Sequence, residues 1–463
     1  MTSSSKNAIG SDKSDSAILG IVTFIVYAVT ATVTATVGPK GLVFSNDTFF
    51  SAYPAWTIAQ LHTINIDTVT QFTRSGWAFI LDGHLRSDRF PGAIFWAVPF
   101  YLIGGSDTFS IGPSAVAAAT ASAITIVFMH RALLSLVNRK TALAAAVLLA
   151  FGTAMWSVSA DSLWTHPTTL MGLAIGSWAM TRSHFAIAGL GYAVAILSRP
   201  HTAVVAAAVG IWESIARKSI RPALLVGATS LLGLIGLVAW NKVNANSWDI
   251  FPGTYGGRFD AAISTGDGGQ AKPDLWGADL VATFFSPLRG IFFYSPFLLA
   301  LLPGVIKAWR VAPAWVRSST VGAGLYLLIQ LAGNVWIGAT DFFGYRLTLE
   351  PLLLVTPLLA LAWQEWTSQI TSARRVFGAL AAVSLWWFAV GSVTRSPDLN
   401  GLSQDLPWTQ WQVPLAIQAH QPGVWLAATV FVAAVGYLVW PITSPPVAAK
   451  PEGKTKKKDK KIY

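Results

Sequence analysis

The chain has 463 residues, of which 53% are hydrophobic and only 11% are charged, and its formal net charge is +11. Soluble domains carry about 25% charged residues, so a chain this poor in charge cannot cover a water-facing surface of its own size. The composition excludes an ordinary soluble enzyme, and it excludes intrinsic disorder, which requires few apolar residues. The absence of cysteine excludes disulfides, thiolate metal sites and a cysteine nucleophile.

Apolar runs of about 15–25 residues recur along the chain, each about long enough to cross a bilayer as a helix. They predict an all-α polytopic membrane protein with about twelve spans. The predicted spans are residues 16–37, 112–135, 141–156, 163–181, 184–197, 201–215, 222–240, 287–307, 318–338, 347–364, 376–393 and 424–441. The first run is too long for the apolar core of a signal peptide, so we expect no cleavable signal.

Lys and Arg collect in alternate connections between the predicted spans, and this pattern indicates orientation because short cytoplasmic loops hold basic residues. The basic connections carry Arg139, Lys140, Arg182, Arg217, Lys218, Arg221, Lys307, Arg310, Arg317, Arg374 and Arg375. With both termini cytoplasmic, the cytoplasmic side holds 21 of the 32 basic residues. The positive charge is therefore mostly an orientation signal and gives no evidence for nucleic acid as a partner.

This topology divides the chain into a cytoplasmic segment (1–15), a transmembrane domain (16–441) and a Lys-rich cytoplasmic tail (442–463). The tail holds seven lysines, which attract anionic lipid. On the opposite side the longest connection is the first extracytoplasmic loop, 38–111. Its apolar stretch from Gly92 to Gly105 is short for a span and predicts an interfacial or re-entrant helix.

Asp47 lies about ten residues beyond the first predicted span, within Ser45-Asn46-Asp47-Thr48. A carboxylate at this surface can act as a general base or coordinate a metal ion. The same pattern also suits an ordinary helix start, and both interpretations remain open.

Two further motifs place polar side chains at the predicted outer surface. Asp88 and Arg89 precede Pro91 at the start of the interfacial helix, where an anion is favoured; the alternative is a capped helix with a snorkelling Arg. Trp164 and His166 belong to the connection from Phe151 to Pro167. Trp can stack on a sugar or isoprenoid and His can bind phosphate; the alternative is an aromatic belt with one satisfied His.

Arg199, Arg289 and Arg346 also stand at the outer ends of predicted spans. Arg is disfavoured on this side and costly near the membrane, unless it is paired or functional. Guanidinium groups bind phosphate bidentately, so together with Arg89 they indicate an anionic ligand at the outer leaflet. Glu350 lies one turn after Arg346, which predicts an i, i+4 ion pair between the two.

The order of these motifs between Asp47 and Pro357 resembles the GT-C superfamily of integral-membrane glycosyltransferases, in particular bacterial relatives of protein O-mannosyltransferases and lipid A aminoarabinose transferases. The resemblance rests on an acidic residue after the first helix and on five motifs in order. These are Asp-Arg-Phe-Pro-Gly (88–92), Gly-Thr-Ala-Met-Trp-Ser (152–157) with His-Pro (166–167), Ala-Ile-Leu-Ser-Arg-Pro (195–200), Ser-Pro-Leu-Arg-Gly (286–290) and Gly-Tyr-Arg (344–346).

The resemblance implies a polyprenyl-phosphate sugar as donor and assigns roles by position. Asp47 would be the general base that activates an acceptor hydroxyl for inverting attack on the anomeric carbon. The residues implied in phosphate binding are Arg89, Arg199, Arg289 and Arg346. The residues implied at the sugar or acceptor site are Asp88, Trp164, His166 and Tyr345. Some members use a divalent cation (Mg²⁺, Mn²⁺ or Ca²⁺) and others do not.

The composition also resembles that of envelope glycosyltransferases of high-GC bacteria, which favours arabinofuranose or mannose as the sugar. The acceptor would be a glycan, a lipid or a protein. The implied location is the bacterial plasma membrane, with the active site on the extracytoplasmic face and membrane lipids as further partners.

Two other hypotheses remain open. A secondary transporter or flippase for a polyprenyl-linked or other anionic substrate also has about twelve helices, but such folds show related halves. The two halves of this sequence show no evident relation. A non-catalytic subunit that binds polyprenyl phosphate is the third hypothesis.

Overall fold

The structure is a computed structural model that describes residues 3–37, 45–69, 77–251, 276–334, 342–393 and 422–443. Within these residues the chain is almost entirely helical, and the only sheet is a two-stranded hairpin. The predicted all-α class is therefore confirmed. The Lys-rich tail beyond Thr443 and most of the connections 241–286 and 394–423 lie outside the described residues.

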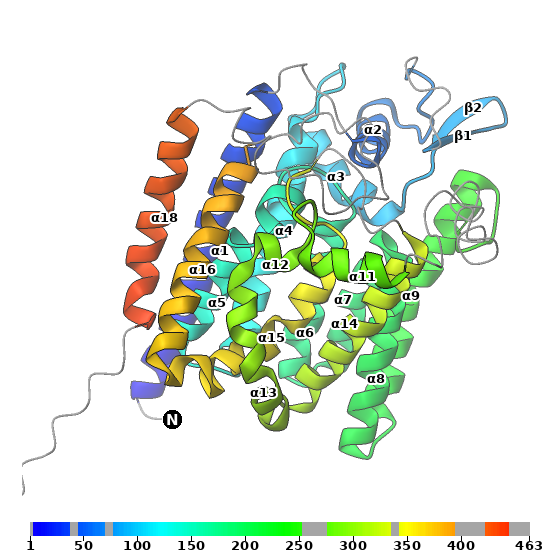
Figure 1. Ribbon diagram of the computed structural model, residues 1–463. Helices are drawn as coiled ribbons and strands as arrows, with labels where there is room; N and C mark the ends of the chain where they lie inside the picture. Colours follow the sequence, from blue (N-terminus) through cyan, green and yellow to red (C-terminus); the bar gives the residue numbers. More distant parts are fainter. Residues whose placement is uncertain are drawn as a thin grey trace, which may run out of the picture.

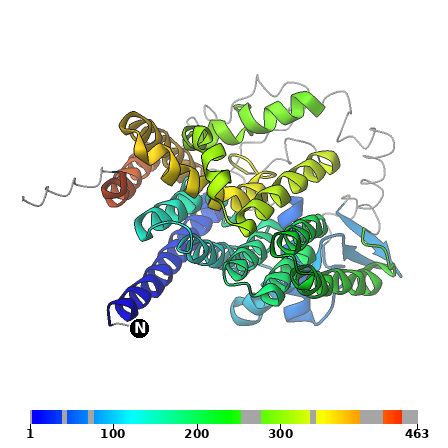
Figure 2. The same ribbon diagram turned by 90° about the horizontal axis from the view of Figure 1, so that it is seen from below.

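Eleven of the twelve predicted spans coincide with a single helix. These are α1 (Ser3–Val37), α4 (Gly112–Leu133), α5 (Arg139–Phe151), α6 (His166–Thr181), α7 (Phe185–Ser198), α8 (Ala203–Arg217), α9 (Arg221–Ala245), α14 (Ala314–Gly333), α15 (Leu349–Glu365), α16 (Thr371–Gly391) and α18 (Pro422–Thr443). Most of them run roughly side by side, from α18 at one edge to α8 and α9 at the other (Figures 1 and 2).

Four helices among the described residues are both long and apolar enough to cross a membrane: Ser14–Thr32, Gly112–Leu133, Arg221–Ala245 and Thr371–Gly391. Shorter apolar helices include Phe185–Ser198 and Pro422–Tyr437. The chain is thus built as a membrane protein, and the count of twelve spans stays a prediction.

The predicted span 287–307 is wrong as a continuous helix. The structure breaks it into α12 (Ile291–Tyr294), the 3₁₀ helix η4 (Pro296–Gly304) and α13 (Val305–Val311). Pro296 and Pro303 explain the interruption, because proline donates no backbone hydrogen bond and clashes with the preceding turn. Hydropathy does not register this effect.

A layer of short elements covers the upper end of the helices (Figure 1). It contains α2 (Asn46–Leu61), the strands β1 (Ala78–Leu81) and β2 (His84–Ser87), and α3 (Pro91–Gly104). The helix α3 confirms the helix predicted from Gly92 to Gly105 almost to the residue, and its interfacial position stays a prediction. The hairpin, with Ala78 paired to Ser87, was missed. The helix α2 begins at Asn46, where the pattern around Asp47 also suited a helix start.

The hairpin holds the segment that follows it. The Arg86 Nη1 group donates to the Val243 carbonyl oxygen at 3.0 Å, and the Asn244 side chain donates to the Ser87 carbonyl oxygen at 2.8 Å. The Ser87 hydroxyl donates to the Phe50 carbonyl oxygen at 2.6 Å. These bonds fix the start of α3 between α2 and the end of α9.

Close packing joins the membrane helices in the centre. At Gly172 and Gly191 a Cβ atom would come within 2.4 Å and 2.7 Å of the facing helix's backbone, so α6 and α7 pack backbone to backbone. Large apolar side chains point outward instead, such as Ile21 and Ile25 on α1 and Leu232 and Ile235 on α9. An apolar outer surface around a packed interior is the arrangement expected in lipid.

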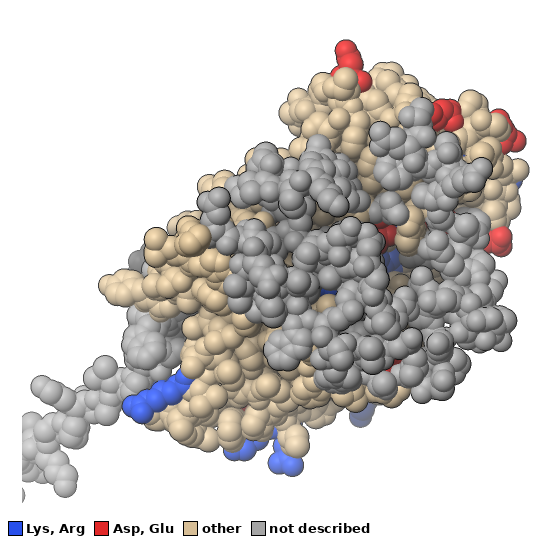
Figure 3. All heavy atoms as spheres, turned by 45° about the horizontal axis from the view of Figure 1, so that its top comes forward, with Lys and Arg blue, Asp and Glu red and all other residues tan. Residues whose placement is uncertain are grey.

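Charges separate along the long axis of the molecule. On the face shown in Figure 3, acidic side chains gather toward the upper end and basic ones along the lower edge. The covering layer of α2, α3 and the hairpin therefore lies at the end opposite the basic connections. The structure contains no membrane, so the predicted orientation of the termini stays a prediction.

Candidate active site

The site centres on Asp47, in the first turn of α2. One carboxylate oxygen accepts a hydrogen bond from Arg89 Nη1 at 2.6 Å, and the other accepts one from Arg346 Nη1 at 2.5 Å. Only 12% of the Asp47 side chain is exposed, against 5% for Arg89 and 11% for Arg346. Three segments that are distant in the sequence thus meet at one carboxylate.

The two arginines determine the ionisation of Asp47. Burial by itself raises the pKa of this carboxyl group, but the charges of Arg89 and Arg346, with a hydrogen bond from Arg346, more than offset it. The resulting pKa of Asp47 is about 2. Asp47 is therefore an anion at any physiological pH, and a weak base while both arginines hold it.

Each arginine lies against an indole ring. The Arg89 guanidinium carbon is 3.9 Å from the centroid of Trp77, and that of Arg346 is 4.5 Å from the centroid of Trp164. Stacking on an aromatic face stabilises a cation and leaves the edges of the guanidinium plane available for anions. The two indole rings therefore orient the arginines toward a shared anionic position.

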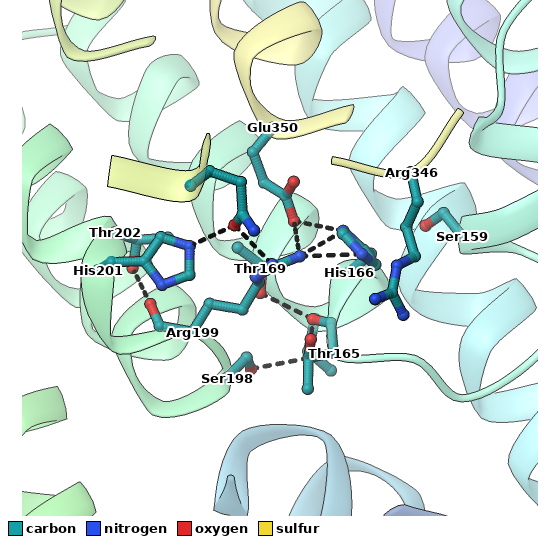
Figure 4. A network of polar contacts seen from close by, with 12 residues as sticks. Ser159, Thr165, His166, Thr169, Ser198, Arg199, His201, Thr202, Arg346 and Glu350 are labelled. Carbon is teal, nitrogen blue, oxygen red and sulfur yellow. Dashed lines mark hydrogen bonds and ion pairs between the residues drawn. The ribbon is translucent and has the colours of Figure 1, made fainter. Parts of the chain in front are cut away.

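A second cluster of polar side chains lies beside the first and is buried among the helices. Glu350 Oε1 is 2.7 Å from His166 Nδ1 and 3.4 Å from Arg199 Nη1, and Arg199 Nη1 lies 2.9 Å from both ring nitrogens of His166. Figure 4 shows the three side chains pointing toward one another, with Arg346 on the far side of His166. Arg199 is thereby held by a buried carboxylate.

This geometry corrects the predicted ion pair between Glu350 and Arg346. Arg346 lies in a turn before α15, which begins at Leu349, so the two residues do not share a helix. Arg346 forms its ion pair with Asp47, whereas Glu350 pairs with His166 and Arg199. The helical spacing assumed for the pair therefore does not exist.

Gln330 extends the second cluster and was not recognised in the sequence. Its side-chain oxygen accepts from Arg199 Nη2 at 2.7 Å and lies 2.8 Å from His201 Nε2. A buried glutamine in an apolar helix is a weak signal, because nothing in the sequence names its partners. It completes a row from His201 through Arg199 to His166 (Figure 4).

Arg289 and Tyr345 support the segment that carries Arg346. Arg289 Nη1 donates to the carbonyl oxygens of Phe342 and Gly344, each at 3.0 Å, and the Tyr345 hydroxyl lies 2.8 Å from the Ser295 hydroxyl. Gly344 has φ +86°, a left-handed conformation that glycine adopts at little cost. These contacts set the path of the turn into Arg346.

Asp88 is buried beside Arg89, and its backbone N–H donates to the Trp77 carbonyl oxygen at 3.0 Å. The structure thus brings Asp47, Asp88, Arg89, Trp164 and Arg346 into one place. His166 and Arg199 lie immediately behind, and Arg289 and Tyr345 lie beneath the Arg346 turn. Sequence reasoning missed Trp77, for which its position before the hairpin was the only signal.

The charges of the cluster do not cancel. Four guanidinium groups lie in the site or directly beneath it, those of Arg89, Arg199, Arg289 and Arg346. They stand against three carboxylates, those of Asp47, Asp88 and Glu350, which leaves one positive charge apart from His166. A buried surplus of positive charge favours an anionic ligand. In the described part of the chain, no group of three or more His, Asp or Glu side chains is placed to hold a metal ion.

Comparison with known proteins gives distant structural similarities only. ArnT from Cupriavidus metallidurans, bound to undecaprenyl phosphate, has a TM-score of 0.46 and 13% identity, over 91% of this chain and 78% of that one. The Archaeoglobus fulgidus oligosaccharyltransferase has a TM-score of 0.44 and 14% identity, over 90% of this chain and 55% of that one. This chain therefore spans about half the length of the oligosaccharyltransferase.

No family model matches the chain, and no curated protein sequence matches it. Function is therefore inferred from the site itself.

Proposed function

We propose that the protein is a membrane glycosyltransferase that transfers a sugar from a polyprenyl-phosphate donor to a hydroxyl group at the Asp47 site. The observation that carries the proposal is a buried carboxylate held between two stacked arginines in a cluster with one surplus positive charge. A base beside an anion site is what transfer from a phosphate-linked sugar requires.

In the proposed reaction, Arg89 and Arg346 bind the donor phosphate, with Arg199 contributing charge from behind. The acceptor oxygen forms a bond to the anomeric carbon while the bond from that carbon to the phosphate oxygen breaks. The hydroxyl proton passes to Asp47, and polyprenyl phosphate leaves with the bonding electron pair. Attack opposite the leaving group inverts the anomeric centre.

The arginines supply the largest share of catalysis. The leaving phosphate gains negative charge as the glycosidic bond breaks, and preoriented guanidinium groups in a water-poor site stabilise that charge better than water does. Trp164, on which Arg346 stacks, and Asp88, which precedes Arg89 in the chain, are the residues proposed for the sugar site. Arabinofuranose and mannose are the proposed sugars, on the resemblance to envelope enzymes, with the site on the extracytoplasmic face.

The test follows release of polyprenyl phosphate by the purified protein from polyprenyl-phosphate sugars, with and without EDTA to cover the divalent cation. Asp47→Asn is expected to lower turnover at least about a hundredfold, the scale of a lost general base. Wild-type turnover in that variant removes Asp47 as the base. Uptake of an intact donor without bond cleavage favours the transporter hypothesis instead.

A further inference from the structure

The position of Asp47 raises a conflict within the proposed mechanism. A general base needs an accessible lone pair, yet each carboxylate oxygen of Asp47 accepts a short hydrogen bond from a guanidinium group. A carboxylate and a phosphodiester both present two anionic oxygens side by side, and both suit the same arginine edges. Asp47 therefore lies where a phosphate bound by these arginines must lie.

We propose that Asp47 and the donor phosphate compete for Arg89 and Arg346, so that donor binding withdraws both guanidinium groups and releases Asp47 as the base. This inference rests on the proposed function and adds an order to it. The donor binds first, and only then can an acceptor hydroxyl be activated.

The surroundings of the two arginines permit such an exchange. Each guanidinium plane rests on an indole ring, Arg89 on Trp77 and Arg346 on Trp164, so it can turn over that face without losing the contact. Arg199 differs, because His166, Glu350 and Gln330 hold it. We therefore assign the exchange to Arg89 and Arg346, and a fixed position to Arg199.

The charge count agrees with competition. With Asp47 as its internal anion, the site has one surplus positive charge, which a monoanionic phosphodiester neutralises. Once the arginines turn to the phosphate, the interactions that hold the pKa of Asp47 at about 2 weaken. Its basicity then rises at the moment an acceptor needs it.

Binding to variants tests the competition without any turnover. Undecaprenyl phosphate, the ligand in the ArnT structure, serves as the probe for the full-length protein in lipid nanodiscs. Asp47→Asn is expected to bind it at least about tenfold more tightly than the wild type, because the internal competitor has lost its charge. Asp67→Asn is the matched control: this outer carboxylate pairs with His84, so binding should not change.

Equal or weaker binding in Asp47→Asn overturns the inference. A structure of the wild type with undecaprenyl phosphate separates competition from simple removal of a negative charge. Competition requires the phosphate on Arg89 and Arg346 with both Asp47 bonds broken; a phosphate bound elsewhere with those bonds intact overturns it. If the wild type transfers the sugar but Asp47→Asn binds undecaprenyl phosphate with unchanged affinity, the competition alone is refuted. If the binding results show competition but the wild type transfers no sugar, the proposed function alone is refuted.

Discussion

Two carboxylates in one site have different tasks, and their surroundings decide which is which. Asp47 retains partial exposure and shares its oxygens with two arginines at the edge of the helices. Glu350 is fully buried, and Glu350 Oε1 serves both His166 and Arg199. In the proposed mechanism the first carboxylate is the base, whereas the second holds the positive charge of Arg199 in position.

Removing Glu350 should therefore destabilise the protein. In Glu350→Leu the Arg199 charge stays buried without a carboxylate, which costs about 3–5 kcal/mol. Glu350→Gln should lose less, since its amide oxygen still accepts a hydrogen bond. Thermal unfolding in detergent measures both, and Glu365→Leu on the same helix, whose carboxylate makes no ion pair among the described residues, is the control. An equal loss in the control contradicts the assigned role.

At this scale the sequence predicted the members of the site better than their contacts. Arg199 and Arg346 were recognisable because arginine at the outer ends of spans is unusual, and Arg89 because it precedes the start of the predicted interfacial helix. The pairing of Asp47 with Arg346 was not, because helical spacing describes neighbours along one helix and these residues belong to distant segments. Glu350 was assigned the wrong partner for the same reason.

Among the elements, the junction of α3 with the end of α7 matters most to the site. Gly92 is the second residue of α3, three residues after Arg89, and it faces Ser198, the neighbour of Arg199. A Cβ atom on Gly92 would come within 2.7 Å of the Ser198 backbone nitrogen. A single close contact thus sets the distance between two arginine-bearing segments.

Gly92→Ala is expected to separate these segments, to lower transfer at least about tenfold and to lower the unfolding temperature. Gly104→Ala at the other end of α3 is the matched control, since the nearest atom to its Cβ would be 3.9 Å away. Activity and circular dichroism melts of both variants in the same detergent provide the comparison. Normal activity in Gly92→Ala would mean that this contact does not position the arginines.

The elements that hydropathy predicted correctly are the long apolar helices and α3. The hairpin was missed although Asp82-Gly83 is a strong signal for a two-residue turn, and both residues indeed have positive φ values of 54° and 80°. Its strands are only four residues each, too short for an alternating pattern to stand out. Local turn chemistry would have found what periodicity did not.

For the whole molecule, the important feature is polarity along the axis of the helices. The short elements over the site lie at one end, and the turn between α8 and α9 lies at the other (Figure 1). Apolar side chains face outward between them. Such a belt with unlike ends predicts that the two ends lie in different aqueous compartments.

The cysteine-free chain allows this topology to be tested directly. Asp107→Cys, in the connection between α3 and α4, should react with a membrane-impermeant maleimide added to intact cells. Ser219→Cys, between α8 and α9, should react only after the membrane is opened. Both residues are exposed, so access to the compartment decides the result. Labelling of both from outside would contradict the predicted orientation.

The pairing of Asp47 with Arg346 also has a consequence for biosynthesis, since 299 residues separate the two partners. During co-translational insertion Asp47 is synthesised early, and most of the helices are inserted before its partner Arg346 is made. Glu350 and Arg346 arrive together near the end. A nascent or truncated chain therefore has no complete site, and competence arises only once insertion is nearly finished.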